Sequence, residues 1–205
     1  RLKIIEKKTR WELNTKDKFF KGIDEKFSID ECTHSFFGVS KTYADLIVQE
    51  YGKNVGLKTV SFRGGCITGP NHSGAKLHGF LSYLVKLSLT KKKYSLIGYK
   101  GKQVRDNLHS EDLVNCFWEF YKRPRKGEVY NMGGGRFSNC SIIEALNLVE
   151  SLANIKIKRE VIKRQRVGDH IWYISNLSKF KKHYPNWKQK YNTKKIIEEL
   201  IEYQK

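Results

Sequence analysis

The sequence is poor in proline and cysteine and contains no long apolar run. Its 205 residues include three prolines and four cysteines, and no segment reaches the roughly 18 consecutive apolar residues of a membrane-spanning helix. The cysteines form no CxxC pair, so neither a zinc site nor a disulfide framework is indicated and reduced thiols are expected. We therefore expect a cytoplasmic protein that binds no metal and does not span a membrane. The four cysteines are Cys32, Cys66, Cys116 and Cys140.

Acidic side chains are scarce relative to basic ones. The chain has 21 aspartates and glutamates against 40 lysines and arginines, which gives a formal net charge of +19. Such an excess is typical of nucleic-acid-binding proteins when the charges gather on one surface. Here the lysines are spread along the whole chain, which indicates a solvated surface, and we expect no specific nucleic-acid partner. The positive field would still attract anionic ligands.

A third absence concerns phosphate-binding turns, because no GxGxxG motif follows a strand near the start of the chain. The remaining pattern alternates between strands and helices and predicts an α/β fold. Residues 1–33 are expected to be irregular, and Ser141 and Glu144 have the spacing of a capping box. Helices are predicted over residues 37–51, 77–89, 110–121, 141–152 and 194–203. Strands are predicted over residues 57–63, 94–97, 128–132 and 155–162.

Four short motifs carry most of the chemical information. Residues 34–41 read HSFFGVSK, in which Phe37 and Lys41 lie one helical turn apart and share a helix face. Residues 63–70 read RGGCITGP and follow a predicted strand, at the end where open α/β sheets bind ligands. Residues 101–112 read GKQVRDNLHSED, and residues 166–169 read RVGD.

In this order the motifs resemble those of the extended short-chain dehydrogenases, the NAD-dependent epimerase/dehydratase family. They look most similar to the branch of CDP-paratose (CDP-tyvelose) 2-epimerases. The resemblance implies a Rossmann-like fold, NAD as the cofactor, a nucleotide-diphosphate sugar as the substrate and a homodimer. It also implies epimerisation at C2 of a CDP-deoxyhexose through a keto intermediate. A 4-epimerase, a 4,6-dehydratase, a decarboxylase or a non-catalytic nucleotide-sugar-binding relative remain alternatives.

On the cofactor side, the resemblance assigns Lys41 to the nicotinamide ribose and the backbone of Gly64 and Gly65 to the nicotinamide. Phe37 stands where the family has its acid/base tyrosine, and a phenyl ring cannot exchange a proton. Proton transfer would then need another group. The candidates are Tyr43, Cys66, His72 and a residue upstream of Arg1.

On the substrate side, the resemblance places Cys66 against the reacting sugar, as a third catalytic position beside Lys41 and Phe37. The nucleotide would be gripped near His72, His78 and Gly79.

The diphosphate would be held by Arg105 and Arg166, because a guanidinium fork matches phosphate oxygens. Asp169 would bind a ribose or position an arginine. Three further polar residues of the third motif have a structural alternative, in which they fix a turn and cap a helix. They are Asp106, His109 and Asp112.

The resemblance also implies a division of the chain. Residues 1–75 would be a remnant of the NAD-binding Rossmann domain that includes the active-site helix. Residues 76–205 would form mainly the nucleotide-sugar-binding region, with elements that return to the Rossmann sheet. Because the dinucleotide-binding turn is absent, we expect the chain to be the carboxyl-terminal part of a longer enzyme. We also expect it to be inactive and to bind NAD poorly by itself.

Overall fold

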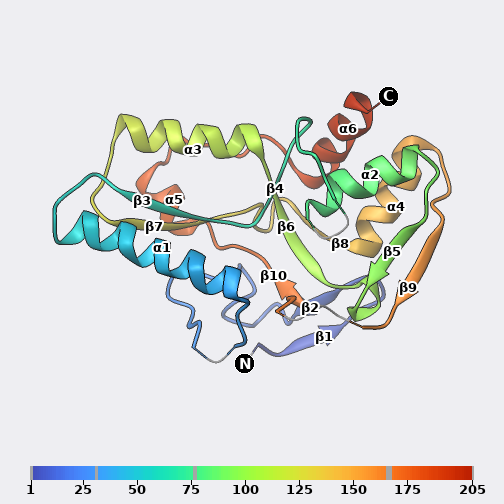
Figure 1. The fold of residues 1–205 in the computed structure, drawn as a ribbon, viewed down its shortest axis with the longest axis horizontal. Helices are drawn as coiled ribbons and strands as arrows, with labels where there is room; N and C mark the ends of the chain where they lie inside the picture. Colours follow the sequence, from blue (N-terminus) through green and yellow to red (C-terminus); the bar gives the residue numbers. More distant parts are fainter. Residues whose placement is uncertain (1, 31, 76–77, 165–167, 205) are drawn as a thin grey trace.

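The computed structural model describes residues 2–30, 32–75, 78–164 and 168–204. Helices and strands alternate along most of the chain, as the sequence predicts (Figure 1). The helices are α1 (Phe36–Lys53), α2 (Phe80–Leu89), η1 (a 3₁₀ turn, Tyr99–Gly101), α3 (Ser110–Lys122), α4 (Ile142–Ala153), α5 (Ser178–His183) and α6 (Thr193–Tyr203). The strands are β1 (Ile4–Glu6), β2 (Trp11–Leu13), β3 (Val60–Gly64), β4 (Cys66–Thr68), β5 (Tyr94–Ile97), β6 (Val104–His109), β7 (Glu128–Met132), β8 (Asn139–Ser141), β9 (Arg159–Ile162) and β10 (Trp172–Tyr173).

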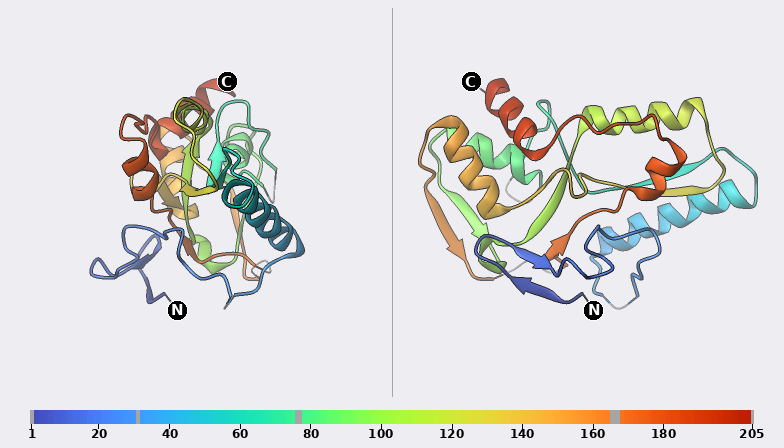
Figure 2. Two further views of the ribbon diagram at one scale, coloured as in Figure 1. Left: turned by 90° about the vertical axis from the view of Figure 1, so that its left-hand side faces the viewer. Right: turned by 180° about the vertical axis from the view of Figure 1, so that it is seen from behind.

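Parallel pairing dominates the sheets. Strand β3 pairs in parallel with β7, and β5 pairs in parallel with β9. Strand β6 lies between β4 and β10, parallel to both, and also pairs antiparallel with β8. Helices α1 and α3 lie on opposite sides of the β3–β7 pair, whereas α2, α4 and α6 gather at the other end of the molecule (Figures 1 and 2). The carboxyl ends of β3 and β7 therefore lie near the middle of the molecule.

The core at the α2–α4–α6 end explains why these helices form. Leu84, Leu146 and Leu200 are fully buried there, and each buried leucine contributes about 1.5–3 kcal/mol relative to an exposed one. Helix α4 starts with the predicted capping box, in which the Ser141 hydroxyl accepts the backbone N–H of Glu144 at 3.1 Å. The Glu144 carboxylate accepts the Ser141 N–H in return, at 3.0 Å.

Helix α1 lies along β3 but buries little of its own surface. The Ser35 hydroxyl caps its start by accepting the Gly38 N–H at 3.1 Å. Near its other end, the Thr59 hydroxyl donates to the backbone oxygen of Val48 at 2.8 Å. Gly52 is the only buried residue of the helix. A group of large apolar side chains of α1 is exposed, namely Phe36, Phe37, Val39, Tyr43, Leu46, Ile47 and Tyr51.

We expect Gly52→Ala to lower the free energy of unfolding by about 2 kcal/mol, the middle of the range for overpacked sites. A Cβ atom at Gly52 would lie 2.1 Å from the backbone nitrogen of Gly127, so the helix and that loop would have to separate. Gly38→Ala on the same helix is the matched control. Its Cβ would meet nothing closer than the Ser35 Oγ at 3.5 Å, and alanine is favoured over glycine in helices by up to about 1 kcal/mol. Urea denaturation of both variants checks the prediction, and equal losses would contradict it.

Several elements differ from the sequence predictions. The prediction that residues 1–33 are irregular is wrong in part, because β1 and β2 form an antiparallel hairpin that buries Leu13. Helix α2 is shorter than predicted and follows Gly79, whose positive φ of 70° is incompatible with a helical position. Of the predicted strand at residues 155–162, only the second half pairs. The sequence patterns did not reveal β4, β6, β8, β10 or α5.

Candidate functional site

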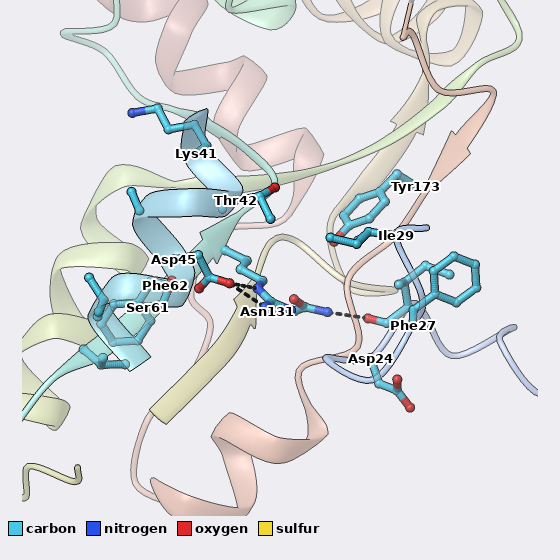
Figure 3. Close-up of a pocket in the computed structure, with 16 residues that line it drawn as sticks. Asp24, Phe27, Ile29, Lys41, Thr42, Asp45, Ser61, Phe62, Asn131 and Tyr173 are labelled. Atoms are coloured by element: carbon cyan, nitrogen blue, oxygen red, sulfur yellow. Dashed lines mark hydrogen bonds and ion pairs between the residues drawn. The ribbon is translucent and has the colours of Figure 1, made fainter. Parts of the chain in front are cut away.

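A cavity of about 620 Å³ lies between α1 and β3 and contains two of the predicted cofactor residues, Lys41 and Gly64 (Figure 3). Its volume falls within the range of about 300–1,000 Å³ that is common for small-molecule sites. Two residues that line the cavity form an ion pair, in which Arg63 donates to the Asp45 carboxylate at 2.5 Å. The other Asp45 oxygen, Oδ1, is buried and accepts no hydrogen bond within the described residues. The residues that line the cavity therefore include a lysine and a carboxylate with one unsatisfied, buried oxygen.

Phe37 lies beside Lys41, as their spacing predicts. The Lys41 Nζ is 5.3 Å from the centre of the Phe37 ring, a distance at which a cation is attracted to an aromatic face. The ring is 71% exposed and does not line the cavity. A hydroxyl group at this position would therefore sit next to an ammonium group without a steric obstacle.

Two further polar residues of the same cavity, Tyr173 and Asn131, have no role predicted from the sequence. Tyr173 on β10 lies across the cavity from Lys41 and Thr42 (Figure 3), and burial raises the pKa of its hydroxyl to about 12. Asn131 on β7 donates to the backbone oxygen of Ile23 at 2.9 Å. Asn131 could have been suspected, because it is the polar residue of an otherwise apolar strand end. Nothing in the sequence pattern singles out Tyr173.

A second cavity, of about 220 Å³, brings together five predicted site residues from distant parts of the chain: Cys66, His78, Gly79, Arg105 and Asp169. Its walls come from β4, the start of α2, β5 and β6. Gln103 also lines it, and the buried Oε1 of this residue accepts no hydrogen bond within the described part of the chain. A polar ligand would supply the missing donor.

Arg105 is held at the edge of this second cavity. Its Nη2 lies 2.6 Å from Oδ1 of Asp169, and its Nη1 donates to the backbone oxygen of Val104 at 2.8 Å. A further bond joins its guanidinium to the backbone oxygen of His170. Asp169 is itself fixed, because the Tyr99 hydroxyl donates to its backbone oxygen at 3.1 Å. Asp169 therefore holds the Arg105 guanidinium in place, and the ligand-binding roles of both residues stay predictions.

Cys66 and Tyr43 are poorly suited to carry the proton that Phe37 cannot. Burial raises the pKa of the Cys66 thiol to about 11, even though the charge of Arg105 opposes the shift. The thiol is therefore protonated at neutral pH. Tyr43 is 67% exposed on α1 and lines neither cavity.

His72 lines a third cavity, of about 430 Å³, whereas His78 and Gly79 line the second. Its ring is perpendicular to that of His78, with 5.5 Å between the ring centres. A Cβ at Gly79 would lie 2.3 Å from His72 Cε1, so glycine is what allows the two elements to meet. Burial, followed by the charge of His78, lowers the pKa of His72. The three predicted nucleotide residues therefore form one cluster.

The structural alternative holds for the three polar residues of the third motif. The Asp106 carboxylate accepts the backbone N–H groups of Gly135 and Ser175 at 3.0 and 2.8 Å. His109 caps α3 by accepting the N–H of Glu111 at 3.1 Å. Asp112 accepts backbone N–H groups of residues 190 and 191. Gly65 packs against this framework, because a Cβ there would lie 2.6 Å from Asp106 Oδ1.

Two predicted site residues of the described part of the chain, Phe37 and Gly65, line none of these cavities. Arg166 falls outside the described residues, so its assignment to the diphosphate stays a prediction. Gly65 does not line the Lys41 cavity, although its neighbour Gly64 does.

In the described ranges, no three His, Cys, Asp or Glu side chains gather in a way that could hold a metal ion. No helix there combines the length and apolarity needed to cross a membrane.

Comparison with known proteins identifies the family. Residues 18–133 match the model of the NAD dependent epimerase/dehydratase family. The chain belongs to this family. Its members are NAD-dependent, and the matched region includes Lys41, Gly64, Gly65 and Arg105.

Individual members of the family extend the comparison. A CDP-paratose 2-epimerase of Salmonella typhi is 31% identical over 143 residues, which cover 67% of this chain and 42% of the relative. A dTDP-glucose 4,6-dehydratase of Bacillus anthracis, crystallised with NAD, has a TM-score of 0.72 and 27% identity over 86% of this chain and 55% of its own. A UDP-glucose 4-epimerase of Bifidobacterium longum, with NAD⁺ and UDP, matches in fold with a TM-score of 0.75 and 22% identity over 89% of this chain and 58% of that chain.

The predicted Rossmann-like α/β fold is thereby confirmed, and the chain spans between about two-fifths and three-fifths of the length of these three relatives.

Proposed function

We propose that this chain is part of an NAD-dependent nucleotide-sugar epimerase that inverts C2 of a CDP-deoxyhexose through a keto sugar. The observation that carries the proposal is the cavity shared by Cys66, His78, Gly79, Arg105 and Asp169. The similarity to the Salmonella CDP-paratose 2-epimerase supports the choice of sugar and carbon. The cavity next to Lys41 supports the choice of cofactor.

The residues of the Lys41 cavity fit the nicotinamide–ribose end of NAD. Lys41 would hold the ribose hydroxyls, and the unsatisfied Oδ1 of Asp45 gives the cavity an acceptor for a donor group of the ligand. Bound NAD supplies the redox chemistry of such an epimerase. The division of labour follows the proposed boundary, since residues 1–75 provide Lys41 and Gly64, and residues 76–205 provide most of the second cavity.

In the second cavity, the chain's own residues bind and orient the sugar nucleotide. Arg105 would contact the diphosphate through its guanidinium group, which Asp169 keeps in place. Gln103 Oε1 would accept a sugar hydroxyl. The proposed homodimer would cover the exposed apolar side chains of α1, among them Tyr43 and Leu46.

We expect Arg105→Lys to weaken the binding of CDP roughly 10–150-fold, because hydrogen bonds to charged groups contribute about 1.5–3 kcal/mol and lysine lacks the planar fork. Arg136→Lys is the matched control. Arg136 forms an equivalent pair with both carboxylate oxygens of Glu12, at 2.8 and 3.1 Å, but lines neither cavity. Calorimetric titration with CDP checks the prediction, and an equal loss in both variants would contradict it.

The proposed function is tested by incubating the whole protein with CDP-paratose and NAD⁺ and following the configuration at C2 by NMR. Inversion supports the proposal and shows that Phe37 is compatible with catalysis. Binding of CDP-sugars without turnover would favour a binding-only relative. Inversion at C4, or loss of water, with UDP- or dTDP-sugars would favour the 4-epimerase or the 4,6-dehydratase. The last alternative is kept because a dTDP-D-glucose 4,6-dehydratase of Dictyostelium discoideum is 31% identical over 121 residues.

A further inference from the structure

A small basic cavity lies at the end of the molecule opposite to the sugar-nucleotide residues. It has a volume of about 230 Å³ and is lined by Arg123, Pro124, Arg125, His183 and Tyr184. These residues come from the loop after α3 and from the end of α5, which lie together at the left-hand side of Figure 1. The second cavity is formed near β5 and α2 at the other side. We call the basic site the Arg123–Arg125 cavity.

The side chains of this cavity are held by contacts of their own. The Tyr184 hydroxyl donates to the backbone oxygen of Arg123 at 3.1 Å, and the Arg123 guanidinium lies 5.6 Å from the centre of the Tyr184 ring. The hydroxyl of the fully buried Tyr130 is 2.7 Å from Nδ1 of His183.

Burial raises the pKa of Tyr130, so its hydroxyl stays protonated beside the His183 ring. Burial, followed by the charge of Arg125, lowers the pKa of His183, which keeps the ring neutral near pH 7. The charged groups that face this ring are Arg125, Glu128, Lys179 and Lys182.

The positive charge of the Arg123–Arg125 cavity is not cancelled by nearby acids. Within the described residues, neither arginine forms an ion pair. The neighbouring carboxylates are engaged elsewhere, Glu119 with Lys122 at 2.6 Å and Glu128 with Lys179 at 2.7 Å. The carboxyl-terminal ends of α3 and α5 point here, and each is equivalent to at most about half a negative charge. Two guanidinium groups exceed that sum, so the cavity is net positive.

We propose that the Arg123–Arg125 cavity binds a phosphate group, either as inorganic phosphate or as the terminal group of a small phosphomonoester. Two guanidinium groups give donors that match phosphate oxygens, and guanidinium is the cation best shaped for them. The site is separate from the proposed sugar-nucleotide cavity, because the two share no lining residue. It therefore does not depend on the proposed function.

The test follows the His183 ring by NMR while inorganic phosphate or glycerol 3-phosphate is added at constant ionic strength, with chloride as the reference anion. We expect saturable shifts of the ring signals and an upward shift of the His183 titration midpoint, because a bound dianion favours imidazolium. A preference for glycerol 3-phosphate would identify a phosphomonoester as the ligand, and a preference for inorganic phosphate would identify the free anion. Equal affinity would mean that the cavity recognises the phosphate group alone.

Arg125→Gln should weaken phosphate binding at least tenfold. Within the described residues its side chain forms no hydrogen bond or ion pair, so the substitution should not impair folding. Arg159→Gln, an exposed position on β9, removes the same charge elsewhere and should leave the affinity unchanged. Arg105→Lys should also leave the His183 shifts unchanged. The proposal is overturned if chloride gives the same shifts, if both glutamine variants weaken binding equally, or if only an oligonucleotide perturbs His183.

Discussion

Replacing Phe37 with tyrosine is expected to raise the turnover of the whole protein by about 10²–10⁴-fold, the usual contribution of a positioned acid/base group. The reason lies in the start of α1, where the Phe37 ring is 5.3 Å from the Lys41 ammonium and mostly exposed. A phenol hydroxyl added there would be close to a positive charge. That charge favours the phenolate and lowers the pKa of the new tyrosine below the ordinary value of about 10.

The control is the double substitution Phe37→Tyr with Lys41→Met. Without the ammonium group the phenol keeps a high pKa, and most of the gain should disappear. The pH dependence of kcat provides a second check, because the single variant should show an ionisation that neither the parent nor the double variant has. A change in KM alone would indicate altered packing rather than proton transfer.

An unchanged or reduced turnover in Phe37→Tyr would mean that the protein has its own proton-transfer group. Tyr173 is then the first candidate, since its hydroxyl belongs to the Lys41 cavity. Burial raises its pKa to about 12, so the phenol is protonated at neutral pH, as the Cys66 thiol is, and could donate a proton but not accept one. Tyr173→Phe would abolish turnover in that case, and it would leave turnover nearly unchanged if the group lies elsewhere.

Phe37 and Tyr173 show how much of the site could be predicted from the sequence. Phe37 and Lys41 are neighbours on one helix, so their spacing alone predicts that they share a face, and the structure confirms it. Tyr173 reaches the cavity through β10, whose partner β6 is about 70 residues earlier in the chain, with Trp172 opposite Val104. No local period encodes such a pairing.

The strands also include one that a local pattern predicts, β7, and one that no local pattern predicts, β6. Strand β7 was predicted with the right bounds, because three glycines directly follow its last residue, Met132. Strand β6 was missed because it consists largely of polar residues, of which Asp106, Asn107 and His109 are buried. Their burial is possible only because loops from elsewhere in the chain supply hydrogen-bond partners. A hydrophobic pattern cannot predict a strand of this kind.

Asp106→Ala is expected to lower the free energy of unfolding by about 3 kcal/mol. The carboxylate is 1% exposed and accepts the N–H groups of Gly135 and Ser175, which join the turn after β7 to the segment after β10. Alanine would leave both donors buried without a partner, and each such group costs about 1–3 kcal/mol. The gain from no longer burying a charged group offsets part of this loss. Urea denaturation at neutral pH measures the difference.

Asp106→Asn separates the role of the acceptor from that of the charge. Asparagine keeps one oxygen for the two N–H groups, so Asp106→Asn should lose less than half of the unfolding free energy that Asp106→Ala loses.

Burial raises the pKa of Asp106 in the folded protein, so the native state holds this proton more tightly than the unfolded chain does. The parent's stability should therefore fall as the pH rises from about 4 through the folded pKa. Asparagine does not titrate, so the advantage of the parent over Asp106→Asn should shrink along the same range. An advantage that grows with pH would mean that the backbone donors stabilise the carboxylate more than burial penalises it.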